Sequence, residues 1–212
     1  MAKLARFLVY VWWVFCMMSK RSATTALSAS SGARNFFLLK SEPNEFSIHD
    51  LAKSADQQSP WTGIRNASAK KNLCAAAVGD RFFFYHSSDG VRTGIVGTGT
   101  FTSKPRPDPT AKDPTSPYFD SKMKAGEEDK GWQCVDVKLE EIFPRTVLLS
   151  DLKARAAAGN AVIAGMTLFK MSRLSVQRLT EDEWHEITRI SRETPAAELG
   201  TVQKRAKKSK AE

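Results

Sequence analysis

The stretch Arg81-Phe82-Phe83-Phe84-Tyr85-His86 decides the fold class. An uninterrupted aromatic run of this length is typical of a strand that is buried on both faces. Ser88-Asp89-Gly90 follows it as a turn, and Val91–Ser103 returns as a second, longer strand. That second strand contains several glycines, which predict a bulge, a barrel bend or the close approach of another backbone. The pair is the centre of a predicted antiparallel sheet.

The segments around this pair are predicted to be short strands and capped helices. Asn35–Lys40 is typical of a short buried strand, Trp132–Phe143 alternates like a half-buried strand, and Leu174–Leu179 is the last strand. N-cap residues predict helices after Ser47, Asn66, Ser150 and Thr180. Antiparallel strands interleaved with short helices, without regular βαβ alternation, predict an α+β fold with a small antiparallel barrel.

Two segments of the body are predicted to lack regular structure. Residues 61–65, Trp-Thr-Gly-Ile-Arg, are expected to form a loop before the helix that Asn66 caps. Lys104–Gly131 loses all periodicity, and five of the nine prolines lie between Pro105 and Pro117. This second segment is therefore expected to be a long surface loop.

The net charge of +9 is concentrated at the two ends of the chain. Residues 1–34 hold five Lys or Arg and no acidic residue, and residues 191–212 carry a net charge of +3. Residues 35–190 hold 21 basic against 20 acidic residues. We therefore expect a targeting or disordered segment (1–34), one folded domain (35–190) and a basic disordered tail (191–212). A nearly neutral domain argues against a broad phosphate-tracking groove and favours a local site.

The two ends also bear on the compartment. The apolar run Phe7–Met18 is 12 residues long, shorter than the roughly 18–20 that span a bilayer, so no membrane attachment of the mature form is expected. The acid-free, Ser- and Ala-rich sequence around it is typical of a mitochondrial transit peptide, with a signal peptide or a disordered start as alternatives. The basic cluster Lys204–Lys210 is compatible with a nuclear localisation signal or a solvated tail, so the nucleus is the alternative compartment.

The usual catalytic and metal-binding motifs are absent from the sequence. The three cysteines and three histidines are scattered without metal-ligand spacing. The chain also lacks a dinucleotide fingerprint, a phosphate loop, an HExxH motif and a nucleophile elbow. His86 and Ser87 would point to opposite faces of a strand, so a base–nucleophile pair is not expected there. We expect neither a cofactor nor a metal, and no catalysis.

A group of polar and aromatic residues at the ends of predicted elements remains as the candidate site. A base-binding pocket needs an aromatic face for stacking, polar groups for the base edge and a cation for phosphate. The alternative for the same residues is structural: Trp61 in the core, Asn66 as a plain N-cap and Arg65 in a surface ion pair. The candidates are Lys40, Ser41, Trp61, Arg65, Asn66, Tyr85 and Ser87.

The motifs that hold these residues resemble those of EVE-domain proteins in sequence and order. The resemblance covers nearly all of Asn35–Ile190 and implies a PUA-like fold, a small, mostly antiparallel barrel decorated by helices. The motifs are Phe37–Pro43, Trp61–Asn66, Gly79–Ser87, Gly94–Gly97, Trp132–Val137 and Arg173–Val176.

The resemblance also implies a function. It implies binding of modified bases, with modified cytosine in DNA foremost, and a distant similarity to YTH domains. It places the seven candidates in the pocket and adds Arg173 as a rim contact. One departure is Phe37, which stands where the family usually has Trp; a stacking face would shrink there if that ring lined the pocket.

The resulting hypothesis is a non-catalytic, monomeric reader of nucleic acid. It would hold one base, either methylated or hydroxymethylated cytosine in DNA or a modified RNA base. The base would stack on Trp61, which we expect to be replaceable without loss of the fold. Ser41 and Asn66 would read its edge, and Lys40 and Arg65 would hold the flanking phosphate. The alternatives are a small hydrolase of PUA-like type and an accessory protein whose loop 104–131 binds a partner beside a vestigial pocket.

Overall fold

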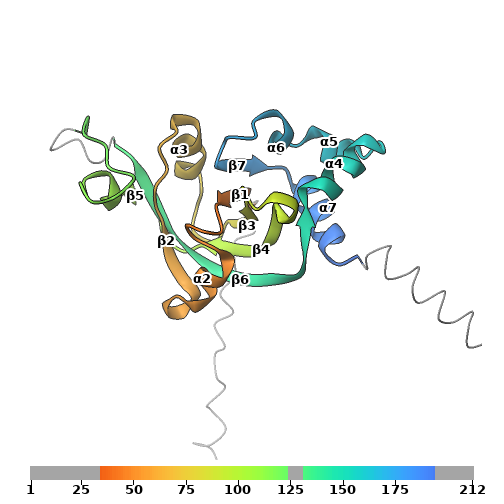
Figure 1. Ribbon diagram of the computed structural model, residues 1–212, viewed down its shortest axis with the longest axis horizontal. Helices are drawn as coiled ribbons and strands as arrows, with labels where there is room; N and C mark the ends of the chain where they lie inside the picture. The colour runs from red at the N-terminus through yellow and green to blue at the C-terminus, as the bar shows by residue number, and fades with distance from the viewer. Residues whose placement is uncertain (1–33, 124–130, 194–212) are drawn as a thin grey trace, which may run out of the picture. The chain divides into compact units, whose positions relative to one another are not determined.

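The computed structural model describes residues 34–123 and 131–193, and one seven-stranded sheet organises them (Figure 1). Neighbouring strands are antiparallel except β1 and β3, which are parallel. A parallel pair needs a long crossover, and residues 42–80 supply it. The sheet order is β2 (Gln58–Trp61), β6 (Gln133–Leu148), β4 (Gly94–Phe101), β3 (Arg81–His86), β1 (Phe36–Ser41) and β7 (Val176–Leu179), with β5 (Arg106–Pro107) paired to β6.

Short helices connect these strands. The helices are α2 (Ile48–Lys53), α3 (Ala67–Cys74), α4 (Leu149–Ala157), α5 (Ala161–Gly165), α6 (Thr167–Lys170) and α7 (Glu181–Ser191), with 3-10 turns η1 (Ala55–Gln57), η2 (Gly90–Arg92) and η3 (Pro109–Ala111). The predicted caps Ser47, Asn66 and Thr180 are confirmed. The predicted cap Ser150 is wrong, because α4 begins at Leu149, two residues before the expected start, and its N-cap residue Leu148 makes no side-chain cap. Within the described residues, no helix is long and apolar enough to cross a membrane.

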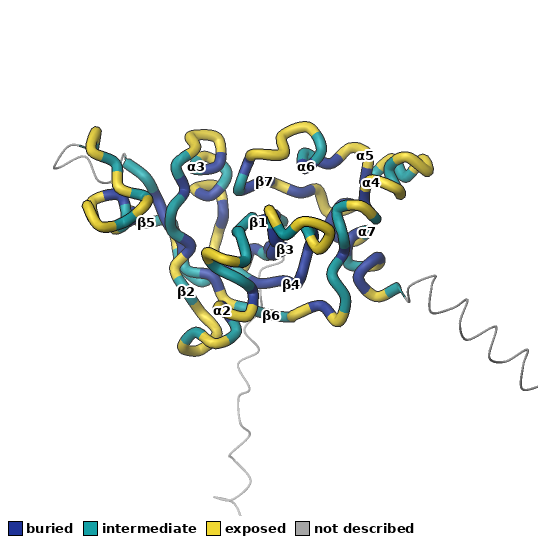
Figure 2. The backbone as a smooth tube through the Cα atoms, viewed as in Figure 1, coloured by how far each residue is buried: buried dark blue, intermediate teal, exposed yellow. Residues whose placement is uncertain are grey.

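The aromatic strand β3 is buried on both faces, as predicted. Phe82 and Phe84 belong to one hydrophobic cluster, whereas Phe83 and Tyr85 belong to another. Successive side chains of a strand point to opposite faces, so the sheet separates the two clusters. Figure 2 shows β3 and β4 dark blue in the middle of the molecule. Both cores therefore depend on this one strand.

The glycines of β4 let β6 pass very close to it. A Cβ atom on Gly97 would lie 2.2 Å from the carbonyl oxygen of Glu141 and 2.5 Å from Cδ1 of Ile48. The β4–β6 register also shifts beside Gly97, as it does at a bulge. The close backbone approach expected from the sequence is thus confirmed. It allows the long strand β6 to pair closely with β4, and β6 pairs with β2 as well.

The strand β2 was not predicted, because its residues are polar and include Pro60. It lies at the edge of the sheet, where a proline is tolerated since one side of the strand has no ladder to complete. The other edge is β7, and α3 packs against both β7 and β6 (Figure 1). Trp61 is consequently the last residue of an edge strand rather than part of a loop.

The predicted end segments lie almost wholly outside this description. Residues 1–33 and 194–212 are not among the described residues. The targeting segment, the basic tail and the apolar run Phe7–Met18 therefore stay predictions.

Candidate functional site

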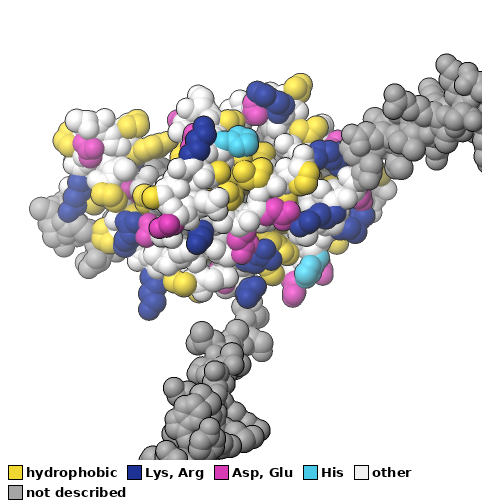
Figure 3. Space-filling model, turned by 90° about the horizontal axis from the view of Figure 1, so that it is seen from below, with side chains coloured by type: hydrophobic (Ala, Val, Ile, Leu, Met, Phe, Trp, Pro, Cys, Tyr) yellow, Lys and Arg dark blue, Asp and Glu magenta, His cyan; other side chains and the backbone are white. Residues whose placement is uncertain are grey.

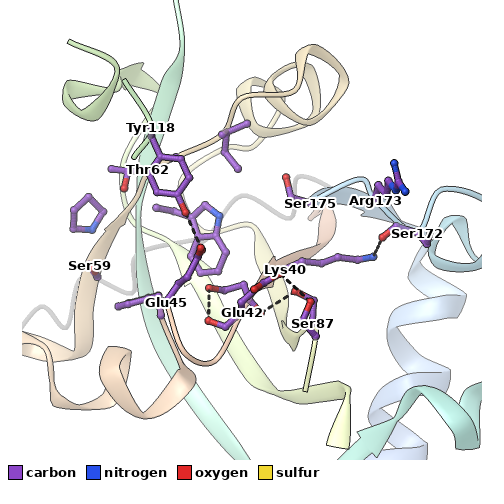
Figure 4. Close-up of a pocket in the computed structure, with 17 residues that line it drawn as sticks. Lys40, Glu42, Glu45, Ser59, Thr62, Ser87, Tyr118, Ser172, Arg173 and Ser175 are labelled. Carbon is purple, nitrogen blue, oxygen red and sulfur yellow. Dashed lines mark hydrogen bonds between the residues drawn. The ribbon is translucent and has the colours of Figure 1, made fainter. Parts of the chain in front are cut away.

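A cleft of about 710 Å³ lies where the ends of β1, β2 and β3 meet the segment before β7 (Figure 4). Its far wall comes from the loop that contains Tyr118. Five of the eight candidates line it: Lys40, Ser41, Trp61, Ser87 and Arg173. The other three, Arg65, Asn66 and Tyr85, do not. The structure thus brings together residues from distant parts of the sequence.

Lys40 is the half-buried cation of the cleft. Its Nζ donates a hydrogen bond to the carbonyl oxygen of Ser172 at 2.8 Å and lies 5.1 Å from the ring centroid of Tyr85. Among the described residues no carboxylate forms an ion pair with it. Burial lowers the pKa of Lys40 to about 8. The ammonium group of Lys40 is therefore charged at neutral pH and can balance a bound anion. It loses its proton as the pH rises above about 8.

Ser41 and Ser87 join the ends of β1 and β3. The main-chain nitrogen and the hydroxyl of Ser87 both donate to the carbonyl oxygen of Ser41, at 2.9 and 3.2 Å. Among the residues that the structure describes, the hydroxyl of Ser41 makes only a long contact of 3.5 Å, with the carbonyl oxygen of Glu42. That hydroxyl is consequently available to a ligand in the cleft.

Two carboxylates, which the sequence analysis did not identify, belong to the lining of the cleft. Glu42 accepts a hydrogen bond from the hydroxyl of Ser88, and Glu45 accepts one from the hydroxyl of Tyr118, each at 2.8 Å. Ionised carboxylates are acceptors only. The cleft therefore offers strong acceptors as well as the hydroxyls and the ammonium group of Lys40.

Tyr118 is the aromatic side chain that sequence reasoning missed. It lies in the proline-rich loop and is neither buried nor fully exposed. Its ring rests on Gly63, where an added Cβ would lie 2.9 Å from the ring and where φ is +78°. Burial, followed by the hydrogen bond to Glu45, raises the pKa of Tyr118. Two features of the sequence could have indicated it: Gly63, which directly follows Trp61-Thr62, and an aromatic residue within an otherwise polar loop.

Arg65 anchors the Tyr118 loop instead of facing the cleft. Its guanidinium donates to Asp108 at 2.7 Å, to the carbonyl oxygen of Tyr118 at 2.7 Å and to Thr110 at 3.0 Å. Burial would raise the pKa of Asp108, but hydrogen bonds from Arg65, Thr110 and the Gly63 amide outweigh it and lower that pKa. The predicted phosphate contact of Arg65 is therefore not supported, because these partners occupy its donors.

Asn66 and Tyr85 also lie outside the cleft. The side-chain oxygen of Asn66 accepts from the amide of Ala69 at 3.0 Å, as the N-cap of α3, and the residue borders a neighbouring hollow. Tyr85 is 2% exposed, and burial raises its pKa to about 12. It lines a second hollow, beneath Lys40. Neither side chain is placed to read a base edge within the cleft.

Trp61 contributes to the cleft from within the core. It is 5% exposed, and its ring meets Phe84 and Phe46 edge-on, with centroids 5.3 and 6.1 Å apart. Such a residue presents an edge and leaves little free face for stacking. The structural interpretation of Trp61 is therefore supported, and the partly buried aromatic rings of the lining are those of Tyr118 and Phe46. The departure at Phe37 has no effect on the cleft, since that ring is fully buried against Phe101.

His86 has a structural role. Its Nε2 accepts a hydrogen bond from the amide of Ile48 at 3.1 Å, and burial lowers its pKa. An acceptor nitrogen committed to the backbone is not free to activate Ser87. In the described ranges, no three His, Cys, Asp or Glu side chains gather in a way that could hold a metal ion.

The surface charge of the domain is mixed. On the face seen in Figure 3, Lys and Arg side chains are interspersed with Asp and Glu. This distribution agrees with the nearly neutral composition of residues 35–190 and directs attention to the cleft rather than to a basic stripe.

Comparison with known proteins finds a matching family model, similar sequences and similar solved structures. The model of the EVE domain matches residues 35–190. Thymocyte nuclear protein 1 of Mus musculus is 34% identical over 190 residues, which cover 84% of this chain and 83% of that protein. A crystal structure of human THYN1 in complex with 5-methylcytosine-containing DNA has a TM-score of 0.72 and 31% identity, covering 76% of this chain and 99% of that one.

A hypothetical protein from Leishmania major is similar as well. Its structure gives a TM-score of 0.68 with 39% identity and covers 74% of this chain and 94% of that chain. All residues that line the cleft lie within the matched range 35–190.

Proposed function

The chain belongs to the EVE-domain family, and from this membership and its cleft we propose that residues 35–190 hold one modified base of a nucleic acid without catalysing a reaction on it. The family and the PUA-like α+β fold expected from the sequence are confirmed by the family match and the solved relatives. One observation carries the proposal: an accessible aromatic ring, acceptors, hydroxyls and a cation line a single cleft. A human relative was crystallised with DNA that contains 5-methylcytosine.

The two sides of the cleft differ in charge, and this difference would orient the ligand. Figure 4 shows Tyr118 and Glu45 on one side and Ser172 and Arg173 on the other. A carboxylate accepts well from the exocyclic amine of cytosine and repels phosphate. We therefore place the amino edge of the base toward Glu45 and the sugar–phosphate toward Arg173 and Lys40. Bases with an amino group are favoured over thymine or uracil.

Energetics favour single strands and moderate selectivity. Stacking on one aromatic ring is worth about 1–3 kcal/mol, whereas extruding a base from a duplex costs a few kcal/mol. A methyl group contributes roughly 1–3 kcal/mol of discrimination, which corresponds to about tens-fold. We expect strong binding only where the target base is already unpaired or weakly paired.

The test is binding of the purified full chain to short oligonucleotides at fixed salt. The panel contains plain, 5-methyl- and 5-hydroxymethylcytosine, N6-methyladenine and thymine, each in single and double strands. Preference for one modified base supports the proposal. Equal binding across the panel, thymine included, would overturn it, because a cleft that reads no base has no reader function.

The charge of Lys40 gives this binding a characteristic pH dependence. Lys40 is protonated below its pKa of about 8 and neutral above it. Affinity for a phosphate-bearing ligand should therefore be constant up to about pH 7 and fall as the pH rises past 8, since only the protonated form balances phosphate. Fluorescence anisotropy between pH 6.5 and 9.5 measures this. A Lys40→Arg variant keeps its charge throughout; an equal decline in that variant would contradict the role of Lys40.

The compartment is part of the proposal. The names of the curated relatives carry the word nuclear, which supports the nucleus, the alternative considered from the sequence. Mitochondrial targeting by residues 1–34 and the monomeric state stay predictions. The loop 104–131, considered above as a partner-binding element, contributes Tyr118 to the cleft and so enters the base-binding proposal.

A further inference from the structure

We propose that the cleft holds the central member of a single strand of at least three nucleotides, and that two hollows beside it receive the neighbouring nucleotides. The inference rests on the proposed function. Ser172 lines the cleft and both hollows. Its carbonyl oxygen also accepts the hydrogen bond from Lys40. We call the segment around Ser172, which follows α6, the ridge; a bound strand would cross it.

The first hollow has a volume of about 360 Å³ and lies on the α3 side of the ridge. It combines the exposed cations Lys170 and Arg173 with Met171, which is 49% exposed, and with Asn66. Within residues 34–123 and 131–193, Arg173 makes no ion pair or hydrogen bond. An unengaged guanidinium is suited to a phosphate, and a thioether is suited to the face of a base or sugar.

The second hollow has a volume of about 380 Å³ and lies on the α4 side of the ridge. Its wall includes Phe169 and Leu149, which are both only partly buried, and the exposed Lys153 of α4. Lys40 lines this hollow as well as the cleft. An aromatic wall beside a lysine provides a stacking surface together with a phosphate contact. Both hollows have the size of small-molecule pockets, about 300 Å³ and above.

Several cations gather around the ridge without a carboxylate partner among the described residues, whereas most arginines elsewhere have one. Arginines such as Arg65, Arg81 and Arg106 each pair with a carboxylate. In contrast, the cations beside Ser172 form no ion pair with any described residue: Lys40, Lys153, Lys170 and Arg173. A local set of uncompensated cations within a nearly neutral domain matches the charge of a short phosphodiester segment.

The experiment compares ligands of increasing length on the full chain. The ligands carry the preferred base as a nucleoside, as the centre of a trinucleotide and as the centre of a nonanucleotide. NMR titration measures the weak nucleoside and anisotropy measures the others. We expect affinity to rise at least tenfold from nucleoside to trinucleotide and little beyond. Lys153→Ala and Lys170→Ala should each lower trinucleotide affinity about threefold to fivefold, as for one exposed ion pair, and leave nucleoside binding unchanged.

The control is Lys138→Ala, which removes an exposed lysine of β6 that lines none of the three cavities. The slope of log affinity against log salt concentration for the trinucleotide should become shallower by about 0.7 in Lys153→Ala and in Lys170→Ala. It should not change in Lys138→Ala. Equal effects of all three substitutions, or equal affinities of nucleoside and trinucleotide, would overturn the inference. Failure of the proposed function has a different signature: ridge-dependent binding of the trinucleotide without any preference among bases.

Discussion

Tyr118→Ala is expected to lower the affinity of the full chain for an oligonucleotide with the preferred modified base about 5- to 150-fold. That range corresponds to the roughly 1–3 kcal/mol that stacking on one aromatic side chain contributes. Tyr118 lines the cleft and is only partly buried, so its ring is accessible to a base. Anisotropy titrations of the variant and the parent chain measure the loss.

Tyr118→Phe is the matched control. It keeps the ring and removes only the hydroxyl that donates to Glu45. Affinity should fall by a few-fold at most. The fold should survive both changes, because Arg65 and Asp108 hold the loop through the Tyr118 main chain and through Gly63. If Tyr118→Ala binds as tightly as Tyr118→Phe, then the base does not stack on this ring.

The sequence predicted the parts of the fold that local patterns encode. The aromatic strand, the capping boxes at Ser47 and Thr180 and the crowding at the glycines of β4 all follow from neighbouring residues. The strand β2 was missed because an edge strand with a proline carries no hydrophobic alternation. The parallel pairing of β1 with β3 was missed because register between distant strands is a tertiary property.

The site was predictable only in part, for a related reason. Lys40, Ser41 and Ser87 stand at strand ends, and strand ends gather at one edge of a sheet. Arg65 lies only a few residues after Trp61, which lines the cleft, but its donors are taken by Asp108, which is 43 residues away. The same arginine also holds Tyr118 beside the cleft, because its guanidinium donates to the carbonyl oxygen of Tyr118. The sequence pattern of one segment cannot show which residue of a distant segment will form hydrogen bonds with a given side chain.

Trp61→Ala separates the two roles that this residue has been given. Because Trp61 is 5% exposed and packs against Phe46, Phe82 and Phe84, its truncation should lower the free energy of unfolding by about 3–5 kcal/mol. That is a large share of the roughly 5–15 kcal/mol that stabilises a typical domain. Trp61 is therefore not expected to be replaceable at no cost to stability: the variant should fold, but with a much lower free energy of unfolding. Urea unfolding of the full chain measures the change, and Trp61→Phe, which keeps an aromatic ring in the cluster, should lose less.

The binding behaviour of Trp61→Ala completes this argument. If the side chain acts through the core, then affinity per folded molecule, measured well below the unfolding midpoint, should change far less than it does in Tyr118→Ala. The combination of unchanged unfolding free energy and abolished binding would instead assign the stacking face to Trp61. The base would then have to displace the edge-on contacts of Phe46 and Phe84 in order to reach the indole, and the cleft would have to open on binding. The two variants, read together, therefore decide between Tyr118 and Trp61 as the ring that the base touches, and whether the cleft is already formed before the ligand arrives.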